Sequence, residues 1–304
     1  MSEHIPSLAD LRREIDVLDD QIQDLLRRRA EAVRRVAATK QSQGSLDNGA
    51  FLRPGREAQI LRRLMERHRQ GLPPAALVRI WREMISALYD LQAPLKVAVH
   101  APNKSAARWD LARDFYGSTT PMQLCNTATA VMRAISAHPM TLGVMAPPEE
   151  GERESWWPML AGRANDTPRV IAKLPFVPNP RGRLAELGAF VIARTPPEES
   201  GEDCTLVVVV ANEEAPSMAR LSTLLAQAGL DGRVLAQQHG AGDGGSRMLV
   251  EIPGFMAEGD ARLAALIAAE PGLIADAVVI GAYPVPVAEV IVSLSVTVEE
   301  GCQP

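Results

Sequence analysis

One long amphipathic helix, predicted over residues 8–43, constrains the fold of this chain more than any other feature. Its apolar positions recur at helical spacing, which places them on one face. They are Leu8, Leu11, Ile15, Leu18, Ile22, Leu25, Val33 and Val36. At a rise of about 1.5 Å per residue, a helix of about 36 residues spans about 54 Å. A helix this long needs a second long helix or a partner chain against its apolar face, so the sequence predicts a dimer.

Two cations, Arg29 and Lys40, lie on the apolar face of this helix. About three helical turns separate them, so both point the same way. A buried unpaired cation is unstable, and each must therefore meet an anion or leave the core. The pattern predicts either an anionic ligand inside a helical bundle or an interhelical salt bridge. Arg12 lies roughly 80–100° around the helix, so we expect it to serve another pocket, such as that of a partner chain.

The composition excludes several classes of protein. A net charge of −5 argues against general nucleic-acid binding, and no stretch is long and apolar enough to cross a bilayer. The polar N-terminus is unlike a secretory signal. Cys125, Cys204 and Cys302 are scattered and lack the spacing of a metal site. We therefore expect a cytoplasmic protein with no metal, no cofactor, and no nucleic-acid or membrane partner.

The first part of the chain is predicted to be a helical domain over residues 1–94. Ser7 is a plausible cap for the first helix. A second helix is expected from Pro54 to about Gln70, because proline is favoured in the first turn of a helix. A third is expected from Ala75 to about Gln92, where Pro94 follows. These boundaries define a module of three helices.

The rest of the chain alternates strands with helices, which predicts two further domains. Residues 95–195 are expected to form a small α/β lobe, and residues 196–203 a linker. Residues 203–290 follow the order βαββαβ of a ferredoxin-like unit. Within it, Gly240–Gly245 predicts a hairpin turn, because no helix or GK[ST] pattern follows to make a phosphate-binding loop. One more strand is expected at 288–298.

Three further polar residues are ambiguous when each is taken alone. Arg56 and Glu57 open the second helix, where a glutamate is favoured and a solvated charge pair is the ordinary interpretation. Gln92 near the end of the third helix is typical of a surface residue. These residues indicate a site only together with inward-pointing Arg29 and Lys40.

The helical part resembles the all-helical type of chorismate mutase. The resemblance covers residues 7–92 and rests on LADLRREIDVLDDQIQDLLRRRAEAVRRVAATK, FLRPGREAQILRRL and LVRIWREMISALYDLQ. Its motif is specific, because polar residues on three helices must agree in spacing. The resemblance implies an intertwined homodimer of three-helix chains, with two sites that convert chorismate to prephenate.

The family's site residues carry over by position. The resemblance implies that Arg12 reaches the site of the partner chain, and that Arg29 and Arg56 belong to the pocket. Lys40 and Gln92 match the pair that hydrogen-bonds the ether oxygen of the breaking bond, and Glu57 matches the acid that holds the substrate hydroxyl. Two positions depart from the family. Arg53 stands where many members carry Asp, and Leu88 where the family often has Ser; both are secondary substrate contacts.

These residue types suit the family's reaction, which is a concerted intramolecular rearrangement. The protein must hold a flexible dianion in its compact reactive conformation and stabilise charge that develops on the ether oxygen. Arginines bind carboxylates in a fixed bidentate geometry, and a lysine and an amide can donate to the ether oxygen.

The order of the remaining domains is similar to proteins in which this mutase is fused to prephenate dehydratase and a small-molecule-sensing ACT domain. The similarity is poor at the motifs that carry dehydratase catalysis and ligand binding. The dehydratase motif Thr-Arg-Phe aligns with Gly188, Ala189 and Phe190, and the phenylalanine-binding glycine of the ACT domain aligns with Ser217. We expect a chorismate mutase with a degenerate extension. The alternatives are a bifunctional mutase–dehydratase and a non-catalytic regulatory protein that binds an aromatic metabolite or a partner enzyme.

Overall fold

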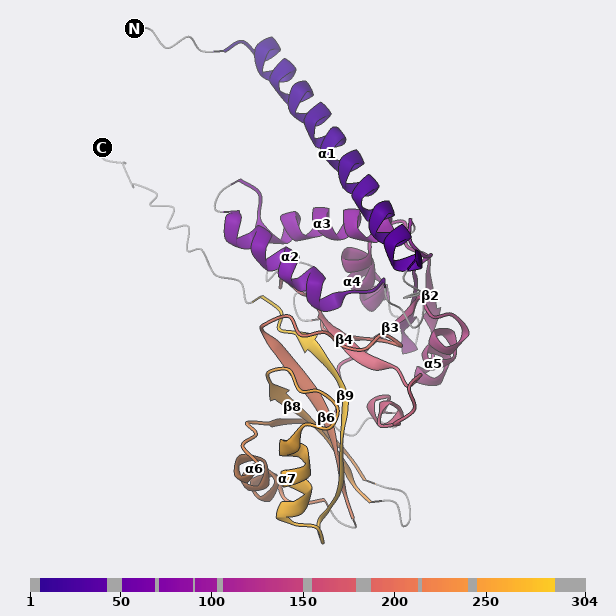
Figure 1. Cartoon of the computed structure of the whole chain (residues 1–304), viewed down its shortest axis with the longest axis vertical. Helices are drawn as coiled ribbons and strands as arrows, with labels where there is room; N and C mark the ends of the chain where they lie inside the picture. Colours follow the sequence, from indigo (N-terminus) through magenta and orange to yellow (C-terminus); the bar gives the residue numbers. More distant parts are fainter. Residues whose placement is uncertain are drawn as a thin grey trace, which may run out of the picture.

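The computed structural model describes residues 6–42, 51–68, 71–89, 91–102, 106–149, 155–178, 187–212, 215–239 and 245–287. A helical part precedes a mixed α/β part built on one sheet, and the first helix extends well beyond the rest of the molecule (Figure 1). The predicted strand at 288–298 and most of the predicted turn Gly240–Gly245 lie outside the described residues.

The helical part consists of α1 (Leu8–Ser42), α2 (Pro54–Arg67) and α3 (Pro74–Tyr89). Ser7 caps α1, since its Oγ accepts a hydrogen bond of 3.2 Å from the amide of Asp10. Helix α3 ends at Tyr89, sooner than the predicted Gln92. The amides of Gln92 and Ala93 both donate to the Tyr89 carbonyl, at 2.8 Å each, in a turn before Pro94. A residue before proline is disfavoured in the helical conformation, so the helix could not have continued through Ala93.

The α/β part contains a nine-stranded sheet in the order β2-β1-β3-β5-β4-β9-β6-β8-β7. Its strands are β1 (Lys96–His100), β2 (Met122–Cys125), β3 (Thr141–Met145), β4 (Arg169–Leu174), β5 (Ala189–Ala193), β6 (Asp203–Ala211), β7 (Arg233–Gln238), β8 (Arg247–Pro253) and β9 (Ile274–Pro284). Its helices are α4 (Ala106–Tyr116), α5 (Ala128–Ala137), α6 (Met218–Gln227) and α7 (Ala261–Ala269). Short strand β2 was not predicted, because it is mostly exposed at the sheet edge and lacks a buried apolar run.

The C-terminal half of the sheet has the predicted order β6-α6-β7-β8-α7-β9. It joins the first half where β4 runs parallel to β9, with Val170 opposite Gly281. Gly281 has φ 146°, and a Cβ there would lie 2.3 Å from the backbone N and O of Val170. Only glycine adopts this conformation readily and lets the two backbones approach so closely.

The segment expected to be a linker, residues 196–203, is instead packed against α2. A Cβ at Gly55 would lie 2.9 Å from Cβ of Glu198. Arg62 donates to Ser200 Oγ at 3.0 Å and to the carbonyls of Glu202 and Val285 at 2.8 and 3.0 Å. Because α2 supplies these donors, the segment is held in place and the helical part contacts both ends of the C-terminal half.

Candidate functional site

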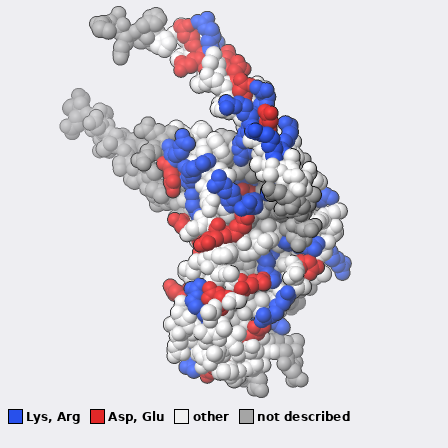
Figure 2. All heavy atoms as spheres, viewed as in Figure 1, with Lys and Arg blue, Asp and Glu red and all other residues white. Residues whose placement is uncertain are grey.

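The predicted site residues Arg29 and Lys40 lie on the C-terminal half of α1, where the helix packs against the rest of the chain. Ala37, between them, is buried with 6% of its surface exposed, and both cations are partly buried. The N-terminal half of α1 is exposed, including Leu8 at 73% and Leu25 at 59%. Lysine and arginine side chains gather on the lower part of α1 and over α2 (Figure 2). The cations therefore face the junction of the three helices while the apolar stripe beyond it stays uncovered.

Arg29 lines an open groove between α1 and α3 together with Leu88. Burial lowers the pKa of Arg29, and the nearby carboxylate of Glu57 partly opposes that shift. Within the described part of the chain, the Arg29 guanidinium has no hydrogen bond or salt bridge. The other groove residues are mostly apolar, among them Ile22, Leu25, Leu26, Leu77, Ile80, Trp81 and Met84. A half-buried guanidinium without a fixed partner, at the edge of an apolar groove, can receive an anionic group.

Lys40 lies beside the start of α2. Its Nζ is 5.2 Å from the centroid of the Phe51 ring, a cation–π contact. Burial lowers the pKa of Lys40; the charge of Arg53 lowers it further, and that of Glu198 raises it. Arg53 itself forms an ion pair with Glu198. Lys40 is therefore a partly desolvated ammonium beside an ion pair of opposite charges.

Glu57 is held by two donors from α3. Arg82 Nη1 donates to Oε2 and the Tyr89 hydroxyl donates to Oε1. The Glu57 side chain is 14% exposed and that of Arg82 is fully buried. The hydrogen bonds to both oxygens thus fix the orientation of the Glu57 carboxylate. Each oxygen keeps a lone pair, so the carboxylate can still accept a hydrogen bond from a ligand hydroxyl.

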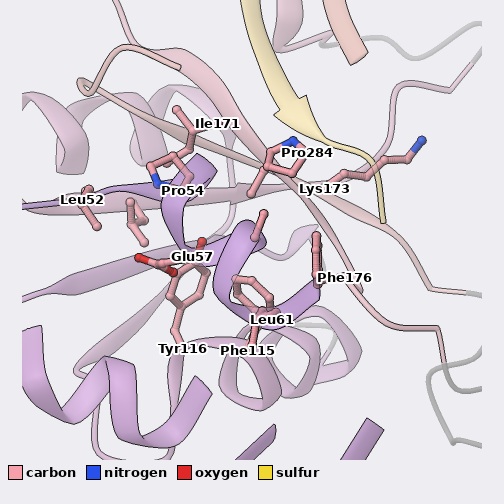
Figure 3. A pocket seen from close by; sticks show the side chains of 13 residues that line it. Leu52, Pro54, Glu57, Leu61, Phe115, Tyr116, Ile171, Lys173, Phe176 and Pro284 are labelled. Atoms are coloured by element: carbon pink, nitrogen blue, oxygen red, sulfur yellow. The ribbon is translucent and has the colours of Figure 1, made fainter. Parts of the chain in front are cut away.

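A small cavity of about 30 Å³ lies next to Glu57, between the helical part and the sheet. Figure 3 shows Phe115, Tyr116, Leu61 and Phe176 around it, while the Lys173 amino group points away. The cavity has room for about one or two waters, but its lining offers few polar partners to hold them. The side of Glu57 that faces the sheet is therefore nearly dry.

The other predicted site residues are distributed unevenly. Gln92 is partly buried just beyond α3, next to Tyr89, and Leu88 lies in the groove with Arg29. Arg56 is exposed and contacts Gln59 at 3.5 Å. Arg12 is also exposed, and 17 residues of helix place it about 25 Å along α1 from Arg29. The groove thus brings together Arg29 and Leu88, and Glu57 lies close enough to affect the pKa of Arg29. Lys40 lies over Phe51 and is not among the groove residues.

Sequence reasoning missed Arg82 and Tyr89. Arg82 follows the polar face of α3, where an arginine is typical of a solvated surface, and it carries no local sign of burial. Its partners lie elsewhere in the sequence, at Glu57 and at Phe115. No periodicity within α3 could have indicated them.

No group of three or more His, Cys, Asp or Glu residues suited to a metal occurs in the described ranges. Among these residues, no helix has the length and apolar character needed to cross a membrane.

Residues 11–93 match the family model for chorismate mutase type II. The chain is 31% identical over 141 residues to a bifunctional chorismate mutase/prephenate dehydratase from Pseudomonas aeruginosa, covering 45% of this chain and 38% of that protein. It is also 31% identical over 142 residues to a protein of the same description from Aquifex aeolicus, with the same coverage. The chain thus spans well under half the length of these relatives.

The chain is also similar in structure to prephenate dehydratase from Streptococcus mutans. The TM-score is 0.43 with 12% sequence identity, over 63% of this chain and 98% of that one. A likeness of this size says nothing about activity.

Proposed function

We propose that the helical part of this chain binds chorismate and rearranges it to prephenate. The observation that carries the proposal is the half-buried guanidinium of Arg29, which lacks an ion pair within the described residues and lines an apolar groove. It belongs to a stretch that matches the chorismate mutase type II family. A cation in this setting needs an anionic partner, and a compact dicarboxylate supplies one.

The roles follow from the chemistry of each group. Arg29 and Arg56 bind the substrate carboxylates, and Glu57 accepts a hydrogen bond from the substrate hydroxyl. Lys40 and Gln92 donate to the ether oxygen as negative charge develops there. No proton is transferred, so the protein contributes the reactive conformation of the substrate and electrostatic stabilisation of the transition state. Arg53 and Leu88 border this site as secondary contacts.

The test of this proposal is direct. Purified protein added to chorismate should remove the ultraviolet absorbance of chorismate and produce prephenate. A protein that binds chorismate without consuming it would instead be the regulatory alternative.

We propose that this chain does not dehydrate prephenate. Gly188 and Ala189 align with the threonine and the arginine of the dehydratase motif Thr-Arg-Phe, and Ala189 lies in β5 with 1% of its surface exposed. Neither residue has a side-chain donor for a leaving hydroxyl or a carboxylate. Formation of phenylpyruvate from prephenate by the purified protein would show that this part of the proposal is wrong.

We further propose that two chains form an intertwined dimer in which Arg12 completes the partner's site. The exposed apolar stripe of α1 supports this, as do the groove between α1 and α3 and the distance of Arg12 from its own site. The division into domains 1–94, 95–195 and 203–290, the ACT-like character of the last, and a cytoplasmic location remain predictions.

The dimer can be tested by mixing two inactive variants, Arg12→Ala and Lys40→Ala. Each homodimer lacks one group in both of its sites, but a heterodimer carries one intact site. Random refolding of equal amounts should restore about a quarter of wild-type turnover, because half of the dimers are mixed and each has one good site of two. If the refolded mixture is no more active than its components, Arg12 does not act across the dimer.

The pH dependence of kcat/KM should report Lys40. Burial lowers the pKa of its ammonium below the ordinary value of 10.5. Because the protonated form is the donor, activity should fall on the alkaline side at a lower pH than an exposed lysine would give. The arginine variant Lys40→Arg should move this fall to higher pH. Gln92 does not titrate, so a steep loss of activity between pH 5 and 7 would contradict its role as the second donor.

A further inference from the structure

Helix α3 presents a polar side to α4, and two residues of this side, Arg79 and Glu83, also line the groove. Arg79, Arg82, Glu83 and Ser86 recur at a spacing of three or four residues and so share one side of the helix. Arg79 pairs with Asp114 at 2.7 Å. Glu83 accepts hydrogen bonds from the amide and hydroxyl of Ser118, at 2.9 and 2.5 Å. The helical part and the α/β part are therefore joined by a specific polar interface.

Arg82 lies at the centre of this interface. Its Nε donates to the carbonyl of Phe115 at 2.7 Å, and its guanidinium carbon is 3.8 Å from the centroid of the Phe115 ring. The Tyr116 ring centroid is 5.4 Å away. A fully buried guanidinium stacked on one ring and bonded to the adjacent backbone has little freedom to move. Helix α4 thus fixes the plane of the Arg82 fork.

The same guanidinium contacts Glu57 through Nη1. Nη2 is buried without a hydrogen-bond partner in the described residues, so Glu57 and Phe115 are the two acceptors that orient the fork there. If the Phe115 ring were removed, the Arg82 guanidinium could tilt. The Glu57 carboxylate, which is hydrogen-bonded to it, would then move as well. A shift of about 1 Å in a substrate-binding group can lower a rate by as much as a hundredfold.

We infer that Arg82 is a positioning residue for Glu57, and that the aromatic ring of Phe115 on α4 is what holds Arg82 in place. The inference rests on the proposed function, because Glu57 acts there as the acceptor for the substrate hydroxyl. It makes the α/β part a component of the helical site, although none of its residues needs to touch the substrate.

The test compares three variants in the full-length protein. Phe115→Leu keeps an apolar side chain but removes the ring, and it should lower kcat/KM for chorismate about tenfold or more. Phe115→Tyr keeps the ring and should stay within about twofold of wild type. Arg82→Lys keeps the charge but loses the planar fork, and should lose at least as much activity as Phe115→Leu. Should Phe115→Leu fail to fold, the result for Arg82→Lys decides.

Phe190→Leu is the matched control, because Phe190 is a buried aromatic residue in β5 that packs against the rings of Trp156 and Tyr283. It should lower the melting temperature and leave kcat/KM within about twofold. The inference is overturned if Phe115→Leu is as active as wild type, if Phe115→Tyr loses as much as Phe115→Leu, or if Phe190→Leu loses as much as either. If wild-type protein does not consume chorismate at all, the proposed function itself is wrong, which is a distinct result.

Discussion

Replacing Lys40 by alanine is expected to lower the turnover of chorismate by about a hundredfold or more. The ether oxygen gains negative charge only in the transition state, so removal of a preorganised donor raises the barrier by about 2.7–4 kcal/mol. Gln92→Ala should have a loss of the same order for the same reason. Steady-state kinetics with chorismate measures both effects.

A suitable control is Arg220→Ala, because Arg220 lies on α6 and pairs with Glu270 at 2.7 Å, in the C-terminal half of the sheet. Turnover of this variant should equal that of wild type. Lys40→Ala or Gln92→Ala with turnover within a few-fold of wild type would contradict the assignment of the two donors.

A large loss of stability is expected for Gly281→Ala. A Cβ at this position would lie 2.3 Å from the backbone of Val170, and the residue has a φ of 146° that alanine rarely adopts. Strain of this kind and overpacking each typically cost about 1–3 kcal/mol, so the free energy of unfolding should fall by about 3 kcal/mol or more. Because the contact joins β4 to β9, the two halves of the sheet should separate more easily. Denaturant titration followed by circular dichroism measures the loss.

Gly272→Ala provides the matched comparison. A Cβ at Gly272 has no heavy atom within 4 Å. Its free energy of unfolding should stay within about 0.5 kcal/mol of wild type, as for most surface substitutions. Equal stability of the two variants would show that β4 and β9 do not approach as closely as the structure has them.

Much of the helical part was predictable because its signals are local. The periodicity of α1, the cap at Ser7 and the proline at the start of α2 each act within one or two helical turns. The interruption of an apolar stripe by Arg29 and Lys40 was equally visible. The structure places both cations in partly buried positions at the helix junction.

The alternation of strands and helices likewise predicted the order β6-α6-β7-β8-α7-β9. It did not predict that this unit continues the sheet of the preceding lobe, because a parallel contact between β4 and β9 depends on strands far apart in the sequence. The packed segment at 196–203 was missed for a similar reason. Its Pro, Glu and Ser content is typical of a linker, and its partners Arg53 and Arg62 are more than 130 residues away in the sequence.

The sequence alone determined most of the helices and strands, and which polar residues stand on an apolar face, since both follow from spacing within a few turns. Tertiary structure alone decided the partners of those polar residues. Arg82 meets Phe115 across 33 positions and Arg53 meets Glu198 across 145. Such pairs depend on how whole elements pack, because a side chain's burial and charge environment come from neighbours that the local pattern does not specify.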